Sequence, residues 1–121
     1  MLKQEGYDLI GAALEVYNEK KGGLLEEIYQ QCMEKELKLQ SIPFESKKGL
    51  KVYYKGQVLD RTYVPDLYVH NAIMVELKAV SELHDEHRAQ LMNYMRITQT
   101  KVGYLINFGN MKELKWERYI I

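Results

Sequence analysis

Three charged residues in the middle of the chain could act together chemically. Glu76 and Lys78 interrupt an otherwise apolar run, 73–80, and Asp66 lies shortly before that run. In a β-strand, residues two apart project from the same face, so Glu76 and Lys78 share a side of the expected strand. Removing a lone charge from water is costly, and these side chains therefore need partners. Asp66 is the nearest candidate along the chain.

Two carboxylates beside an amine suit the hydrolysis of phosphodiester bonds. Hard divalent cations prefer carboxylate oxygens, so Asp66 and Glu76 form a candidate metal pair. Such a cation generates hydroxide from water and stabilises charge on phosphoryl oxygens. Lys78 could orient that water or neutralise the anionic transition state. The same E-x-K triplet also fits a surface ladder or a cross-strand ion pair with no ligand. Its place in an apolar strand favours the site.

The connection between the two expected strands decides whether the carboxylates meet. Directly opposed residues share a face of a sheet, and Asp66 opposes Glu76 if the connection has an odd number of residues, such as 70–72. A two-residue turn would place Asp66 opposite Val75, on the wrong face, unless a bulge near Asp66 corrected the register. We expect the two carboxylates to lie on the same side.

A later segment offers polar groups at helical spacing. His87, Gln90 and Tyr94 fall at i, i+3 and i+7 and share one helical face. They could point at the end of the sheet that carries Glu76 and Lys78. A solvated stripe with one packed tyrosine has the same period, so both interpretations stay open on periodicity alone.

An earlier segment places an acid and an aromatic residue one helical turn apart. Glu26 and Tyr29 follow the pair Gly22-Gly23 directly. Acids are favoured in a first helical turn by the helix dipole, and this effect by itself accounts for Glu26.

Hydrophobic periodicity predicts the elements that must position these residues. Apolar residues recur at helical spacing over 3–20 and about 24–39, and Ser81 could cap a third helix from about residue 82 to 98. Lys55-Gly56 predicts a tight hairpin turn between two β-rich segments. The expected strands cover 44–54, 57–64, 66–69, 72–80, 101–108 and 114–120.

The order of elements predicts an α/β fold with an N-terminal helical pair. The segment 73–108 reads strand, helix, strand, and such a connection normally joins parallel strands by a right-handed crossover. The antiparallel pairs before it make the sheet mixed, with helices on its faces. A length of 121 residues fits one domain over 1–121.

Composition narrows the setting of the protein. We find no apolar run long enough to span a bilayer and no apolar segment typical of a secretory signal, so we expect a cytoplasmic protein without membrane contact. The lone Cys32 cannot form an intrachain disulfide. The formal net charge of zero does not favour nonspecific adhesion to nucleic acid. A local basic run is usually a solvated face; here it contains Lys47, Lys48, Lys51, Lys55 and Arg61.

Four motifs in order resemble a known family. "GLLEEIY", 23–29, matches the pattern that names the GxxExxY protein family. Pro65-Asp66 and "ELK", 76–78, resemble the signature of the PD-(D/E)xK nuclease superfamily, in which that family is placed. "HRAQLMNY", 87–94, resembles its next motif, and "KVGYLINFG", 101–109, its closing strand.

The resemblance implies a restriction-endonuclease-like core and a metal-dependent site. It implies that Mg²⁺ or Mn²⁺ is held by Glu26, Asp66 and Glu76, with Glu26 reaching the site from the second helix. Asp66, Glu76, Lys78 and Gln90 would be catalytic. Supporting roles would fall to Tyr94, His87 and Tyr29.

These observations predict a nuclease that hydrolyses phosphodiester bonds of DNA or RNA. The alternative is a catalytically inactive nuclease-fold module that binds nucleic acid or a protein partner, which neutral net charge favours. A structural ion-pair cluster without ligand is the third interpretation. A two-fold homodimer is expected if both strands of a duplex are cut, because that needs two sites.

Overall fold

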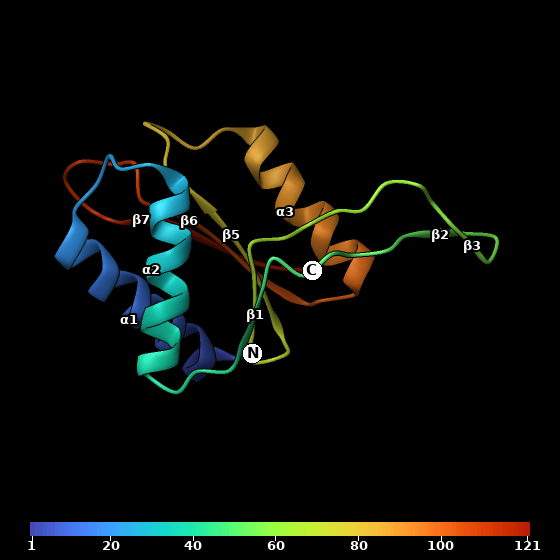
Figure 1. The fold of residues 1–121 in the computed structure, drawn as a ribbon, viewed down its shortest axis with the longest axis horizontal. Coiled ribbons are helices and arrows are strands. Elements are labelled where there is room, and N and C mark those ends of the chain that lie inside the picture. Colours follow the sequence, from blue (N-terminus) through green and yellow to red (C-terminus); the bar gives the residue numbers. More distant parts are fainter.

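A five-stranded mixed sheet forms the middle layer of the computed structural model, which describes residues 1–121 (Figure 1). Its strands lie in the order β1-β4-β5-β6-β7. The long strands β5 and β6 form its centre because almost all of their residues are buried. The strands are β1 Phe44–Ser46, β4 Leu67–Val69, β5 Ile73–Lys78, β6 Val102–Asn107 and β7 Lys115–Ile120.

The strand pairing confirms the predicted mixed sheet. Strands β5 and β6 pair in parallel and are joined through helix α3, Asp85–Thr98. The pairs β1–β4, β4–β5 and β6–β7 are antiparallel. The strand-helix-strand segment therefore forms the parallel crossover that its sequence order indicated.

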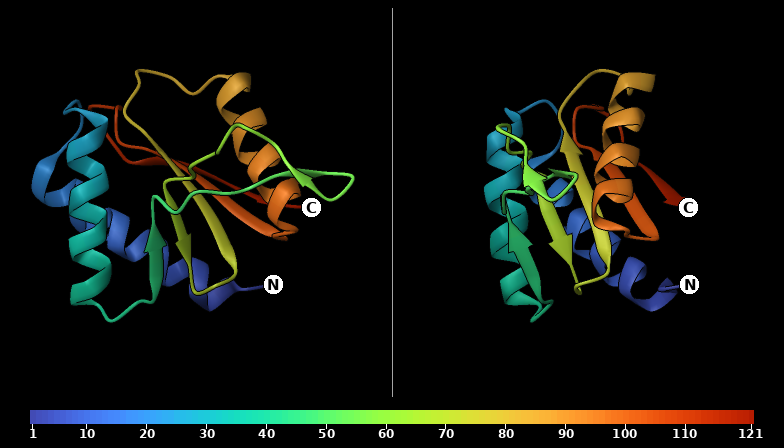
Figure 2. Two further views of the ribbon diagram at one scale, coloured as in Figure 1. Left: turned by 45° about the vertical axis from the view of Figure 1, so that its right-hand side comes forward. Right: turned by 90° about the vertical axis from the view of Figure 1, so that its right-hand side faces the viewer.

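Helices cover both faces of this sheet (Figures 1 and 2). Helix α1, Lys3–Lys20, and helix α2, Glu26–Leu39, pack on one face over the larger part of the core. Helix α3 packs on the other face over a smaller apolar cluster. Strand β5 serves both layers, since Val75 and Leu77 belong to the first cluster and Met74 to the second. Glu76 shares the face of Met74 and is therefore directed toward α3.

Residues 47–64 form a long hairpin, here named the arm, that projects from the body (Figure 1). Its tip carries strands β2, Tyr53–Tyr54, and β3, Gln57–Val58. Lys55 and Gly56 both have positive φ, at 49° and 79°, which is the conformation that a two-residue hairpin turn requires. The predicted hairpin is confirmed, but the two long regular strands expected on either side of it are wrong, because only short pieces are paired as strands.

The third helix begins later than the sequence indicated. His84 is its N-cap, and the His87 ring accepts from the His84 backbone N–H at 3.0 Å. The prediction of a cap at Ser81 is wrong because the preceding segment is held extended. The Asn107 side chain accepts from the Val80 N–H at 3.0 Å and donates to the Val80 carbonyl at 2.9 Å. None of the helices has the length and apolarity needed to cross a membrane.

Tyr29 fixes the loop between α1 and α2. Its hydroxyl donates to the Lys21 carbonyl at 2.5 Å and accepts from the Leu24 N–H at 3.0 Å. Its ring stacks on Phe108 with centroids 4.5 Å apart. These contacts explain why α2 begins at Glu26, two residues after the expected start.

Tyr29→Phe is expected to lower the free energy of unfolding by about 1–3 kcal/mol, because a part-buried N–H and a carbonyl lose their partner. Tyr7→Phe is the matched control, since Tyr7 is 76% exposed and is expected to leave stability unchanged. Urea unfolding of the three proteins measures the difference. Equal stability of the Tyr29 variant and the wild type would contradict this role.

Candidate active site

The register of β4 and β5 brings the two central carboxylates together. Leu67 pairs with Val75, so Asp66, the residue before β4, lies opposite Glu76. The connection is the three residues 70–72, and His70 and Asn71 turn the chain with positive φ. The expectation that the two carboxylates share a side of the sheet is confirmed, and of the two connections considered the structure has the odd one.

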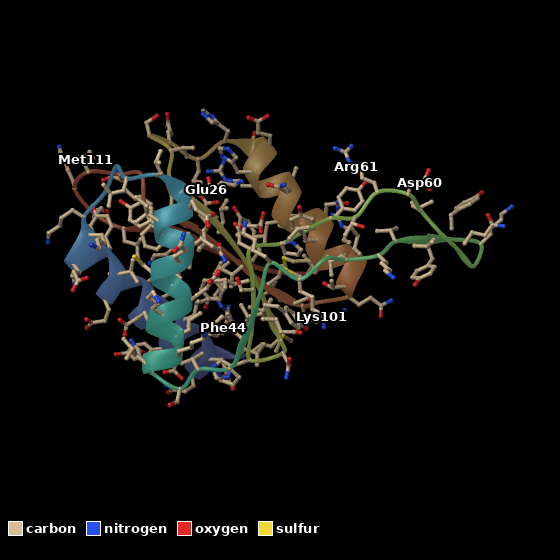
Figure 3. All side chains as sticks on the ribbon, viewed as in Figure 1. Glu26, Phe44, Asp60, Arg61, Lys101 and Met111 are labelled. Atoms are coloured by element: carbon tan, nitrogen blue, oxygen red, sulfur yellow. The ribbon has the colours of Figure 1, made fainter.

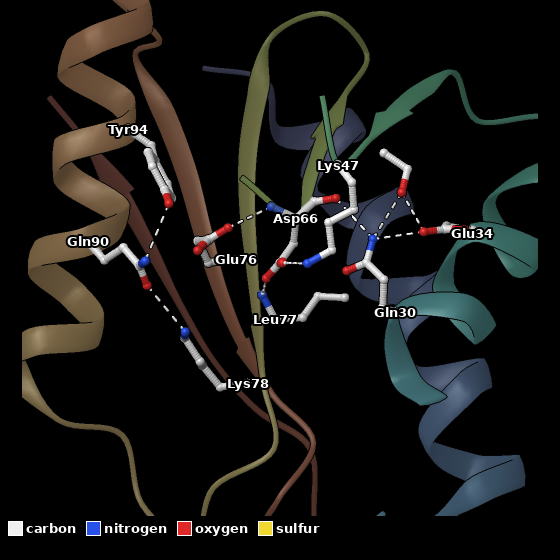
Figure 4. Close-up of polar contacts among 10 residues, drawn as sticks. Gln30, Glu34, Lys47, Asp66, Glu76, Leu77, Lys78, Gln90 and Tyr94 are labelled. Carbon is white, nitrogen blue, oxygen red and sulfur yellow. Dashed lines mark hydrogen bonds and ion pairs between the residues drawn. The ribbon is translucent and has the colours of Figure 1, made fainter. Parts of the chain in front are cut away.

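Asp66 and Glu76 hold each other through backbone amides. The Asp66 N–H donates to Glu76 Oε2 at 2.7 Å, and the Leu77 N–H donates to Asp66 Oδ2 at 2.7 Å. Both side chains are buried, with Asp66 5% and Glu76 3% exposed. Each carboxylate is therefore fixed by the chain that carries the other (Figure 4).

Lys47, at the foot of the arm, supplies a cation that the sequence analysis did not assign to the site. Its Nζ lies 2.5 Å from Asp66 Oδ1, and its N–H donates to the Asp66 carbonyl at 3.1 Å. Burial acts to lower the pKa of Lys47, but the hydrogen bond to Asp66 and the charges of Asp66, Glu76 and Glu26 outweigh it and raise that pKa. The Lys47 ammonium thus lies in the field of all three acids that were predicted to bind metal.

Gln30 is a second residue that the sequence analysis missed. Its buried side-chain amide donates to the Asp66 carbonyl at 3.0 Å and to Ser46 Oγ at 3.1 Å. It also donates to Glu34 at 2.9 Å. Its Oε1 is buried without a hydrogen-bond partner and lies on the side of Lys47 (Figure 4). Its position four residues after Glu26 on α2 was the available signal.

Helix α3 approaches the site from the opposite side and positions Lys78. The Lys78 Nζ donates to Gln90 Oε1 at 3.2 Å, and Gln90 Nε2 donates to the Tyr94 hydroxyl at 3.4 Å. Burial raises the pKa of Tyr94, and the charge of Glu76 raises it further. The structure therefore brings Gln90 and Tyr94 together with Lys78, as the helical spacing indicated.

A model of the PD-(D/E)XK nuclease superfamily matches residues 3–119. The chain belongs to this superfamily.

A solved structure supports the fold of this superfamily member. "Crystal structure of SSO0001" is similar with a TM-score of 0.62 and 17% sequence identity, covering 78% of this chain. The likeness spans only 48% of that longer chain. A comparison with curated proteins gave no match.

Three expected site residues of this superfamily member make no hydrogen bond to Asp66, Glu76 or Lys78. His87 is half-buried, and its Nδ1 accepts from the His84 N–H at 3.0 Å. Tyr29 is buried against Phe108 and has its hydrogen bonds in the loop 21–24. Glu26 is the exposed first residue of α2 and makes no side-chain hydrogen bond or ion pair (Figure 3). Their roles at the site stay predictions.

The donor set fits a cation that keeps most of its water. No three His, Cys, Asp or Glu side chains converge into a metal site. Mg²⁺ is commonly held by one or two carboxylates, with water and substrate phosphate completing its octahedron. Asp66 and Glu76 supply those carboxylates, and the Gln30 side chain, whose Oε1 is buried without a partner, contacts the Asp66 backbone.

Burial raises the pKa of the Glu76 carboxyl to about 8, and the charge of Asp66 acts in the same direction. The Asp66 N–H and the charges of Lys78 and Lys47 act against this rise. Without a metal ion, Glu76 therefore keeps its proton to a higher pH than an ordinary carboxyl does. The bound proton neutralises one of the two carboxylates of the pair, as a cation would otherwise do.

The free energy of unfolding of the metal-free protein is expected to fall as pH rises from about 5 to about 8. Over this range folded Glu76 holds a proton that the unfolded chain has released, so stability declines by at most about 1.4 kcal/mol per pH unit. Glu76→Gln removes this decline. Urea unfolding in EDTA at several pH values measures the difference between the two proteins, and a difference independent of pH would contradict the raised pKa.

Proposed function

We propose that the protein is a metal-dependent nuclease that hydrolyses phosphodiester bonds of DNA or RNA. The observation that carries the proposal is the buried pair of Asp66 and Glu76, opposed on adjacent strands, with Lys78 two residues further along β5. Membership of the superfamily supports the same chemistry. The motif Gly23, Glu26 and Tyr29 supports assignment to the GxxExxY family within it.

Asp66 and Glu76 would hold Mg²⁺ or Mn²⁺, with Glu26 reaching it through water. When bound, the ion supplies a nucleophilic water of lowered pKa and stabilises charge on phosphoryl oxygens. Binding of a cation at the pair would displace the proton of Glu76, and both carboxylates could then serve as ligands.

The residues around the pair would orient the reacting groups. Gln90 fixes the Lys78 ammonium, which is only partly buried and can donate to an attacking water or to a phosphate oxygen. Tyr94 supports Gln90 from the next turn of α3. Asp66 keeps its orientation through the Leu77 N–H on Oδ2, and a cation at Oδ1 would have to displace the Lys47 ammonium from that oxygen.

An inactive binding module is the second candidate. Lys47 on Asp66 Oδ1 favours it, because an internal ammonium already compensates the carboxylate that a metal would need. Nucleic acid stays the proposed partner in both cases, and a homodimer stays a prediction.

Lys78→Ala is expected to lower cleavage by about 10²-fold or more while keeping Mn²⁺ binding, because an ammonium stabilises charge but is no metal ligand. Asp66→Asn is expected to lose both, since it removes a carboxylate charge. Gln90→Ala is expected to be milder than either. Calorimetry with Mn²⁺ and cleavage of a panel of single-stranded, duplex and branched DNA and RNA give the two readouts. If Lys78→Ala cleaves like wild type, Lys78 is a structural charge; if wild type cleaves nothing, the binding module replaces the nuclease.

Lys47→Met is expected to tighten Mn²⁺ binding several-fold in the absence of nucleic acid. A half-exposed ion pair is worth at most about 1 kcal/mol, which corresponds to about fivefold in affinity. Lys48→Met is the matched control, because Lys48 pairs with Glu45 outside the site. Unchanged or weaker Mn²⁺ binding by the Lys47 variant would show that the ammonium does not compete with the metal.

A further inference from the structure

The arm is a two-stranded ribbon that starts beside Asp66 of the candidate active site. At its foot, the backbone N–H of Lys47 donates to the Asp66 carbonyl at 3.1 Å. Leu50 and Tyr63 then exchange two backbone hydrogen bonds, of 2.6 and 3.2 Å. The return chain has extra residues between Tyr63 and the tip strands, and Asp60 and Arg61 project from it there (Figure 3).

The arm concentrates positive charge in a chain that has none overall. It holds five of the 17 basic residues and one of the 17 acids, so the arm carries +4 and the rest of the chain −4. The foot cations Lys47 and Lys48 are paired with acids. The outer cations, which are exposed and have no ion pair, are Lys51, Lys55 and Arg61.

The arm also exposes aromatic rings that nothing in the chain covers. Tyr53 is 62% and Tyr54 64% exposed, and as neighbours in a strand they project from opposite faces of the ribbon. Lys55 lies over the Tyr54 ring, with Nζ 5.5 Å from its centroid. A lone two-stranded hairpin is marginally stable in water, so a bound partner would stabilise this one.

We propose that the arm binds single-stranded nucleic acid, with Tyr53 and Tyr54 stacking on unpaired bases and Lys51, Lys55 and Arg61 holding phosphates. The proposal rests on the nuclease function and names its substrate class. Aromatic side chains beside a basic track are the features that bind single strands, because a base offers its ring face for stacking only when it is unpaired. A duplex would use the cations and leave the tyrosines without a role.

The arm is continuous with the site that would cut the strand. Tyr54 lies seven positions after Lys47 in the chain, so the outer tyrosine lies at most about 25 Å from the foot. A pocket of about 180 Å³ opens at the foot, lined by Lys48 and Leu50 from the arm and by Tyr68 and Met74 from the sheet. A strand stacked on the tip can therefore follow the arm to Asp66.

A second copy of the chain that meets the arm with its own arm fits less well. Two arms meeting across a two-fold axis would bring two +4 segments together, and like charges repel. A polyanion has the complementary charge along its whole length.

Fluorescence anisotropy in EDTA tests the arm without cleavage. The probes are a labelled single-stranded DNA of about 16 nucleotides, the same sequence as RNA, and the blunt duplex. We expect wild type to bind at least one single strand more tightly than the duplex. Tyr53→Ala and Tyr54→Ala should each weaken single-strand binding by at least about fivefold. The double change Lys51→Gln with Lys55→Gln should reduce the salt slope by about 1.4, because each single-strand phosphate contact contributes about 0.7.

Matched variants outside the arm separate its role from general effects. Tyr7→Ala removes another exposed tyrosine, and Lys20→Gln with Lys38→Gln removes two exposed lysines of α1 and α2. Both controls should bind like wild type. Light scattering of the tyrosine variants should show the oligomeric state of wild type.

Equal binding of the arm variants and wild type overturns the proposal, as does duplex binding that is equally tight and equally sensitive to the tyrosines. A change of oligomeric state with unchanged nucleic-acid binding assigns the arm to a second copy and also overturns it. Its failure is separable from that of the nuclease. If wild type binds single strands through the arm but cleaves nothing, only the nuclease function is rejected. If cleavage is unaffected by the arm variants, only the role of the arm is rejected.

Discussion

Burying two carboxylates side by side is the constraint around which this domain is arranged. Asp66 and Glu76 are almost inaccessible to water, yet each is acidic and each lies within the field of the other. Two like charges in a medium of low dielectric constant strongly destabilise each other, so the pair requires positive charge from somewhere. A proton on Glu76, the Lys47 ammonium and a divalent cation are three ways of supplying it. The Lys47 ammonium belongs to the chain, the proton comes from water, and the divalent cation is what the proposed nuclease function would add.

The elements around the pair follow from this requirement. Helix α2 contributes Gln30, which holds the Asp66 carbonyl, and α3 contributes Gln90, which holds Lys78. Lys47, at the foot of the arm, contributes its ammonium to Asp66 from a third segment of the chain. Because the three approach from different segments, the pair is fixed only when the sheet, both helical layers and the foot of the arm are in place. The arm thereby connects an exposed cationic surface to the buried charges through a single ion pair.

Much of this arrangement could be predicted from the sequence because it is encoded locally. The apolar run broken at Glu76 and Lys78 identified a buried central strand, and the three-residue connection 70–72 set the register that opposes Asp66 to Glu76. The spacing of Gln90 and Tyr94 identified the face of α3 that meets Lys78.

The remaining contacts depend on long-range geometry. Lys47 differs in no local way from the other lysines of the basic run, and only the pairing of β1 with β4, continued by one residue, brings it to Asp66. Gln30 is 36 residues from Asp66 in sequence, and its position one helical turn after Glu26 does not reveal which residue it contacts. The late start of α3 has a similar cause, since the Asn107 side chain that holds Val80 extended comes from a strand 27 residues further along.

Anomalous diffraction from a crystal soaked in Mn²⁺ tests the central claim most directly, because it locates the metal rather than inferring it from activity. We expect an anomalous peak in contact with both Asp66 and Glu76, at about 2.1 Å from their oxygens, with the Lys47 ammonium moved away from Asp66. Saturating Mn²⁺ that leaves no peak at the pair and keeps Lys47 on Asp66 Oδ1 would contradict it. The buried carboxylates would then be a structural ion-pair cluster.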